Sequence, residues 1–139
     1  MVHSILLFIM LLLPGQTDSL PNKKFQRIDK PVIAVKPQEI TFDTTEGKFY
    51  QAEVKILNRG VGTLVISRVE SSCKCGSSTI MNSTVEPMTI GIIRLAVNYE
   101  GLFGDQNVVE FIVHSNASNS PTSVKVRINK SKLDSLKNK

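Results

Sequence analysis

The chain has 139 residues, a net charge of +5, two cysteines and no tryptophan. Its length suits one domain, and a domain of about 100 residues buries roughly two-thirds of its unfolded surface, so folding requires neither a metal nor a disulfide. The basic excess lies in residues 20–30 and 131–139, whereas residues 31–130 carry ten bases and nine acids. Because a nucleic-acid-binding domain carries a basic face on the fold itself, this distribution argues against that class and leaves the tails at most weak contact with anionic surfaces.

The N-terminal segment is typical of a secretory signal peptide. Residues 5–13 are apolar but too few to cross a bilayer, which takes about 20 residues. Breakers and small polar residues follow the run, although no basic residue precedes it and no Ala-x-Ala site follows. We predict a signal peptide over residues 1–19, cut between Ser19 and Leu20, then a basic flexible lead-in over residues 20–30. A buried N-terminal strand or an uncleaved anchor is the alternative.

The first half of the domain shows strand patterns. Residues 32–35, bracketed by prolines, suit an edge strand that residues 39–42 continue. The period-two alternation in residues 50–56 predicts a core-facing strand, and residues 58–62 close it with glycines that tolerate positive φ. Residues 63–70 form a third strand. The predicted inward side chains are Tyr50, Ala52, Val54, Ile56, Leu64, Ile66 and Val69.

The second half continues the alternation. Residues 71–78 are polar, small and cysteine-bearing, and read as a loop, while residues 90–99 are the longest apolar run. Glycines frame another loop around Phe103. The inward positions of the last three strands are Ile93, Leu95, Val97 and Tyr99, then Val109, Phe111 and Val113, then Val124, Val126 and Ile128. About seven short strands over residues 31–130 predict an all-β antiparallel sandwich, with a small barrel as the alternative, followed by a charged tail over residues 131–139.

The order of the motifs resembles the DUF1573 family, a group of mostly bacterial exported proteins of unknown function. The residues that carry the resemblance are Val54-x-Ile56-x-Asn58-x-Gly60, Leu64-x-Ile66, Ser72-Cys73-x-Cys75, Pro87, Leu95-x-Val97, Gly101-x-Phe103-Gly104 and Phe111-x-Val113-x-Ser115-Asn116. The resemblance implies an immunoglobulin-like sandwich, similar to the ASH and major-sperm-protein modules, and no settled activity. Two departures are Met88, where the family often has glycine, and Gly76, which precedes Ser77 after the second cysteine.

The pair Cys73-Lys74-Cys75 carries the most distinctive chemistry. On an extended strand the two Cα atoms would lie about 6.6 Å apart, near the upper end of the disulfide range of about 4.4–6.8 Å, and a bend at Lys74 would bring them closer. A bond between them would close a very small ring and be easily reduced. Three states remain open: a labile disulfide, favoured by export, two free thiols, or a soft-metal site for Cu(I) or zinc.

Other chemistry lacks the residues that it needs. Structural zinc takes four ligands, and His114 is the sole histidine after the predicted signal peptide. A nucleophilic Ser72 or Ser77 would depend on that same histidine as its base. We therefore expect no catalysis and no cofactor, and metal binding only at Cys73 and Cys75.

The sequence predicts a secreted or periplasmic, non-enzymatic module that binds a protein partner or another envelope component. The end loops of such sandwiches are common contact surfaces. The candidate contact residues are therefore Lys74, Gly76, Gly101, Phe103 and Gly104. The alternative is a copper- or redox-handling protein that uses Cys73 and Cys75.

Overall fold

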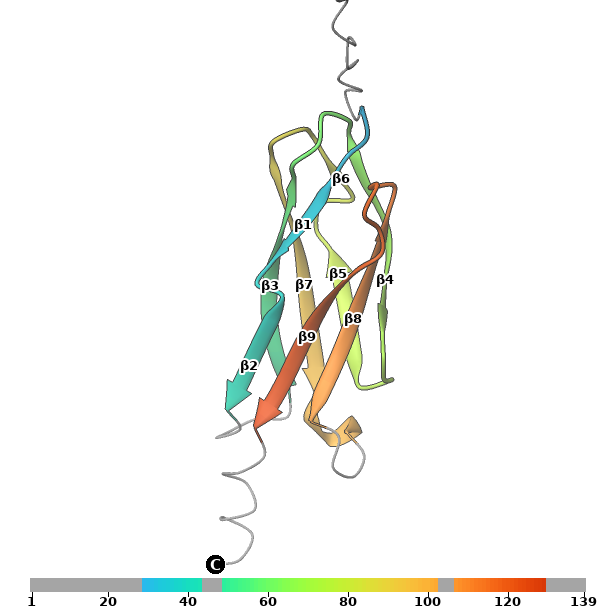
Figure 1. Ribbon diagram of the computed structural model, residues 1–139. Coiled ribbons are helices and arrows are strands. Elements are labelled where there is room, and N and C mark those ends of the chain that lie inside the picture. Colours follow the sequence, from blue (N-terminus) through green and yellow to red (C-terminus); the bar gives the residue numbers. More distant parts are fainter. Residues whose placement is uncertain (1–28, 44–48, 103–106, 130–139) are drawn as a thin grey trace, which may run out of the picture.

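Alternating apolar side chains build two stacked sheets in the computed structural model, which describes residues 29–43, 49–102 and 107–129 (Figure 1). The first sheet has the strand order β1-β3-β7-β5, and the second has the order β2-β9-β8-β4-β6. The elements are β1 (Ile33–Lys36), β2 (Glu39–Asp43), β3 (Phe49–Asn58), β4 (Leu64–Ser71), β5 (Gly76–Ile80), β6 (Thr84–Val85), β7 (Ile90–Asn98), the 3-10 turn η1 (Tyr99–Gly101), β8 (Val108–Ser115) and β9 (Thr122–Asn129).

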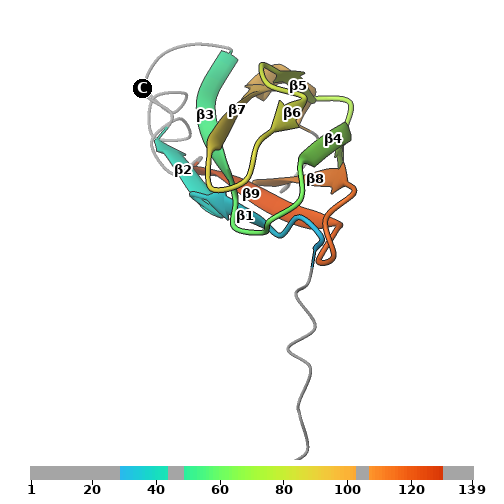
Figure 2. The same cartoon turned by 90° about the horizontal axis from the view of Figure 1, so that it is seen from above.

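The core lies between the two sheets, as the alternation predicts. Seen from above, β3, β7 and β5 face β9 and β8 across it (Figure 2). Side chains that point inward contribute about 1.5–3 kcal/mol each when fully buried. The fully buried set includes Val54, Ile56, Leu64, Ile93, Val97, Val109, Phe111, Val113, Val124, Val126 and Ile128. The predicted all-β sandwich is therefore confirmed.

The predicted count of about seven strands is too low, because nine are present in the described residues. Residues 39–42 do not continue β1. The chain leaves the first sheet after Lys36, and β2 joins the second sheet, where it pairs with β9 in parallel. Pro37 stands at this crossing, has no N–H for a ladder and fixes its own φ. Among the strands that the structure describes, this parallel pair is the exception to antiparallel pairing.

The predicted loop over residues 71–78 is also too long, because Gly76–Ile80 forms β5 and pairs with β7. The half-buried face of β5 carries Gly76, Ser78 and Ile80. Small residues at the first two of these positions leave little apolar alternation to recognise. Only residues 72–75 turn.

A β-bulge explains how Val69 points inward although it lies three residues after Ile66. The pairing of β4 with β8 shifts register between Ile66 and Arg68. The extra residue in a bulge reverses the facing of those that follow. Val69 accordingly packs against the core.

Asn58 is the buried polar residue at the end of β3 and joins four segments. Its Oδ1 accepts from the N–H groups of Gly60 (3.0 Å) and Val32 (3.4 Å). Its Nδ2 donates to the carbonyls of Gly62 (2.7 Å) and Val85 (3.1 Å). These bonds hold the β3–β4 turn against β6 and the approach to β1.

Gly60 is required here for close approach rather than for positive φ, which corrects the sequence-based expectation. A Cβ on Gly60 would collide with the backbone of Lys30, Pro31 and Val32. Because all three obstacles are main-chain atoms, no side-chain movement would relieve the collision.

Met88 has a φ of 60° and is the one non-glycine residue with positive φ among the described residues. It follows Pro87 in a turn closed by a hydrogen bond from Thr89 N–H to Glu86 O at 3.1 Å. Pro at the second position and positive φ at the third define a type II turn, which favours glycine at the third. Met88 therefore occupies the place where the resembled family often has glycine.

We expect Met88→Gly to raise the free energy of unfolding by about 0.5 to 1 kcal/mol. Relief of the left-handed backbone, which costs a side-chain-bearing residue about 1–2 kcal/mol, outweighs the added freedom of glycine in the unfolded chain. Met88 is 73% exposed, so little packing is lost. Urea unfolding measures the change. Met81→Gly, at another exposed methionine, is the control and should destabilise; stabilisation of both variants, or of neither, would contradict the explanation.

Candidate functional site

The cysteine pair lies in the tight turn between β4 and β5, at the lower end of the sandwich in Figure 1. The Cα atoms of Cys73 and Cys75 are 5.1 Å apart, and the two sulfurs lie within bonding distance. Gly76 N–H donates to Cys73 O at 3.3 Å and closes the turn. The chain therefore bends at Lys74, and the separation falls inside the disulfide range.

The three residues of this turn differ in exposure. Cys75 is buried, with 6% of its surface accessible, and Cys73 is half-buried against the core. Lys74 between them is exposed. The cation of the turn thus faces solvent while the sulfurs face the protein.

Ser72 fixes the turn to β8 through two hydrogen bonds with Glu110. Its N–H donates to Glu110 O at 2.9 Å, and its hydroxyl accepts from Glu110 N–H at 3.0 Å. A serine engaged in this way holds one strand end against another. The geometry gives Ser72 a positioning role.

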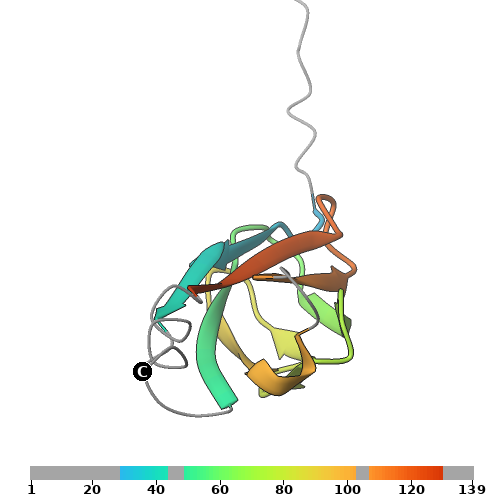
Figure 3. The same cartoon turned by 90° about the horizontal axis from the view of Figure 1, so that it is seen from below.

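The two predicted loops meet at Cys75. Asn98 N–H donates to Cys75 O at 2.7 Å, and Gly101 lies directly on Cys75. A Cβ on Gly101 would approach Cys75 Cβ to 2.9 Å, which is too close for real atoms. Figure 3 views this end from below. Phe103 and Gly104, the other candidates of this loop, lie outside the described residues, as do Ser19 and Leu20.

A side chain at Gly76 would be enclosed, although the residue itself is half-buried. A Cβ there would collide with Ser71 Oγ and would lie 2.9 Å from Cζ of the fully buried Phe111. Its side-chain position is therefore filled by its neighbours, and it supports the turn from beneath.

Comparisons with known proteins place the chain in a family. The model of the family described as "Protein of unknown function (DUF1573)" matches residues 33–129. The chain belongs to the DUF1573 family. A search of curated proteins finds no match.

Solved structures share the fold of this DUF1573 domain at low identity. A protein of unknown function from Porphyromonas gingivalis is 15% identical with a TM-score of 0.62, covering 78% of this chain and 51% of its own. The ASH/PapD-like domain 7 of human CEP192 is 11% identical with a TM-score of 0.56, and the match covers 84% of this chain and 96% of that domain. WR4, an MSP family member from C. elegans, is 14% identical with a TM-score of 0.54, and the match covers 70% of this chain and 98% of WR4. The chain therefore spans about half the length of the P. gingivalis protein, and these likenesses establish the MSP/PapD-like, immunoglobulin-like fold.

His114 of the DUF1573 domain contacts a carboxylate on the neighbouring strand β4. Its Nε2 lies 3.1 Å from Glu70 Oε2, while Arg68 Nε lies 2.7 Å from Glu70 Oε1. The Arg68 guanidinium and, after it, the His114 ring hold the pKa of the Glu70 carboxyl below its ordinary value of 4.5. Across the described residues, no three His, Cys, Asp or Glu side chains group as metal ligands do.

We expect Glu70→Gln to lower the free energy of unfolding slightly at neutral pH. Since the folded-state pKa lies below the unfolded value, the contribution of the carboxylate is complete above pH 4.5 and is lost as the pH falls through the folded pKa. The difference between wild type and variant should therefore shrink below pH 4.5. Urea unfolding from pH 7 down to about pH 3 measures it, and a difference that persists unchanged at the lowest pH would contradict this account.

The sequence-based reasoning missed the role of Asn119, on the β8–β9 loop. Its Oδ1 accepts from Ile33 N–H at 3.0 Å, and its Nδ2 donates to Ile33 O at 2.8 Å. The amide thus replaces a neighbouring strand along one edge of β1. The two residues are 86 positions apart, so no local pattern signals the pair.

In the described part of the chain, no helix is long and apolar enough to cross a membrane.

Proposed function

We propose that the chain is an exported, non-enzymatic module that binds a protein partner or another component of the cell envelope. Its contact surface is the cysteine end, which we define as Lys74, Gly101 and the turn of residues 72–75. The observation that carries the proposal is the seating of Gly101 on Cys75. This contact joins two loops, distant in the sequence, into one surface.

The hydrogen bonds of Ser72, in the cysteine end, and of His114, outside it, support binding rather than catalysis. Ser72 is engaged with Glu110, and His114 contacts Glu70. A hydrolytic role would need a serine and a histidine within hydrogen-bond reach of each other. The fixed backbone and the exposed Lys74 suit a preformed contact surface, because rigid surfaces lose less entropy on binding.

Photo-crosslinking in cells that express the full chain tests this surface. A benzophenone amino acid replaces Lys74 in one variant, and Thr79, exposed on β5, in the control. We expect one discrete crosslinked species at position 74 and none at position 79, and the species should persist when both cysteines become serine. Equal labelling at both positions, or none at either, would contradict the proposal.

The proposed export rests on residues 1–19 and has its own measurement. N-terminal sequencing of the protein recovered outside the cytoplasm should begin at Leu20. A product that begins at Met1 and stays in the cytoplasm would contradict export.

The second candidate function is copper or redox handling by Cys73 and Cys75. The adjacency of the two sulfurs favours it, since two thiolates suffice to hold Cu(I). Thiol titration of the processed protein, with and without reductant and Cu(I), separates the candidates. Two thiols that appear on reduction and are protected by copper would support this candidate; thiols that copper leaves reactive would contradict copper handling.

A further inference from the structure

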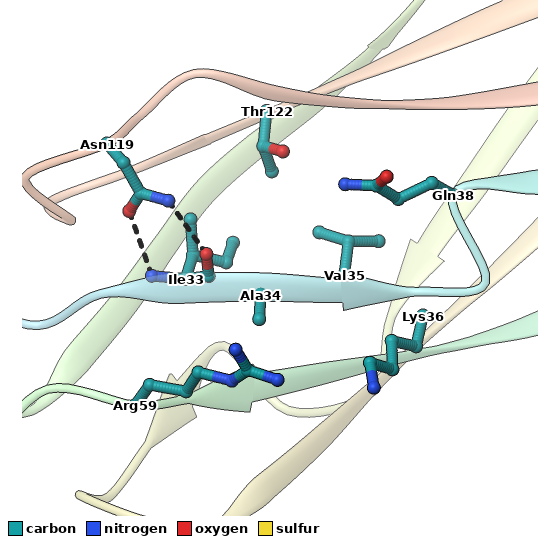
Figure 4. Close-up of a pocket in the computed structure, with 8 residues that line it drawn as sticks. All are labelled: Ile33, Ala34, Val35, Lys36, Gln38, Arg59, Asn119 and Thr122. Carbon is teal, nitrogen blue, oxygen red and sulfur yellow. Dashed lines mark hydrogen bonds between the residues drawn. The ribbon is translucent and has the colours of Figure 1, made fainter.

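A groove of about 400 Å³ runs along the edge of β1 that faces β9 (Figure 4). Asn119, Thr122 and Gln38 lie on one side of β1, and Lys36 and Arg59 lie on the other. A second hollow of about 340 Å³ shares Gln38 and Thr122 with the first. Together they form the β1–β9 groove, whose second part is also lined by Glu39, Ser123 and Lys125.

The main chain of Val35 faces this groove. Val32 O accepts from Arg59 N–H on the β3 side, while Ile33 N–H and O bond Asn119 on the opposite side. Since main-chain groups alternate along a strand, Val35 N–H and C=O point the same way as those of Ile33. Val35 also lines the groove. A nearly buried main-chain pair needs hydrogen-bond partners, and the groove is where they would come from.

The groove carries an excess of positive charge. Lys36, Arg59 and Lys125 form no ion pair with any residue that the structure describes, whereas Glu39, the acid of the groove, bonds Arg127 at 3.0 Å. Lys36 also lies directly opposite Lys55 in the pairing of β1 with β3. Like charges at opposite positions are destabilising, so an acidic ligand would relieve a cost that the free protein bears.

We propose that the β1–β9 groove binds an extended acidic segment of a partner protein. One peptide unit of that segment bonds Val35 N–H and C=O, and its carboxylates bond Arg59, Lys36 and Lys125. The free edge is short, because Asn119 occupies Ile33 and Pro37 has no N–H. Charge therefore supplies most of the affinity, which should fall with added salt.

The main-chain groups favour a peptide over an anionic membrane. A peptide offers both a donor and an acceptor, as the Val35 pair requires, whereas a phosphodiester offers acceptors alone. Val35 is 3% exposed and lines the groove. A flat bilayer would meet the lysine and arginine side chains without reaching it. The groove uses none of the residues of the cysteine end, so its test is independent of the proposed function.

Binding is tested with the processed protein and a fluorescein-labelled peptide of alternating Glu and Val. The variant Lys36→Gln/Arg59→Gln should weaken binding roughly tenfold or more, because each cation makes a charge-assisted hydrogen bond. The control Arg68→Gln/Arg94→Gln removes equal charge outside both the groove and the cysteine end, and it should change the affinity less than twofold. The same peptide with Gln in place of Glu should not bind measurably.

An NMR readout on the Val35 amide separates groove binding from general attraction. The acidic peptide should shift this amide resonance at low salt, and phosphatidylglycerol vesicles should not. Equal weakening by the control variant, or peptide binding without a Val35 shift, would overturn the proposal in favour of nonspecific attraction. Binding to the vesicles alone, lost in Lys36→Gln/Arg59→Gln, would overturn it in favour of a membrane surface. Absence of binding to either probe would overturn it as well.

Discussion

An Asn58→Ala variant is expected to lose about 3 to 5 kcal/mol of its free energy of unfolding. The side chain is fully buried and satisfies two N–H groups and two carbonyls of the β3–β4 turn, β6 and the approach to β1. Without the Asn58 amide, each of these four main-chain groups loses a hydrogen-bond partner. An unsatisfied buried group costs about 1–3 kcal/mol where water cannot enter. Urea unfolding of wild type and variant measures the loss.

The matched control for this prediction is Asn116→Ala. Asn116 also joins distant segments, accepting from Val65 N–H at 2.8 Å and donating to Thr63 O at 3.1 Å, but it is exposed. Water replaces its bonds, so a loss of about 1 kcal/mol is expected. If the two variants lose similar amounts of unfolding free energy, burial does not explain the contribution of Asn58 to stability.

A Gly76→Ala variant is expected to lose about 2 to 3 kcal/mol. The new methyl group would collide with Ser71 Oγ and approach Cζ of Phe111. Phe111 is fully buried and lies among close-packed neighbours. The first strand residue after the cysteine turn would therefore have to move away from β8.

Partial rescue distinguishes a local collision from a general intolerance of this turn. Adding Ser71→Ala removes the hydroxyl that meets the new methyl group. Gly76→Ala should therefore lower the free energy of unfolding less in the Ser71→Ala background than in the wild type. Coupling of zero in this double-mutant cycle would contradict the collision. Thr79→Ala, an exposed position on the same strand, should change stability by less than about 0.5 kcal/mol.

Local alternation made the long strands predictable. In β8 and β9 each buried position is valine, isoleucine or phenylalanine and each of its neighbours is half-buried or exposed, so the pattern alone sets the facing. It fails for β5 because the half-buried face of this strand begins with Gly76 and Ser78, which are not apolar, and Phe111 and Ser71 leave no room for a side chain at Gly76. It fails for β6 because two residues are too few to show a period.

The two candidate sites also differ in whether local sequence could predict them. The close approach of Cys73 and Cys75 follows from their spacing and a single bend, and both lie in one short turn. The β1–β9 groove depends on a crossing between sheets at Pro37 and on Asn119, which lies far along the chain. Such a surface arises from tertiary pairing, and no short window of sequence contains its residues.

The parallel pairing of β2 with β9 has a mechanical consequence. Residue 29 enters at one end of the sandwich and Asn129 leaves at the other (Figure 1), roughly 25–30 Å of strand length apart. Tension between these points pulls β2 and β9 in opposite directions along their shared axis. The ladder that runs from Glu39 with Lys125 to Asp43 with Asn129 then bears the load in shear, so its bonds resist together instead of opening one after another.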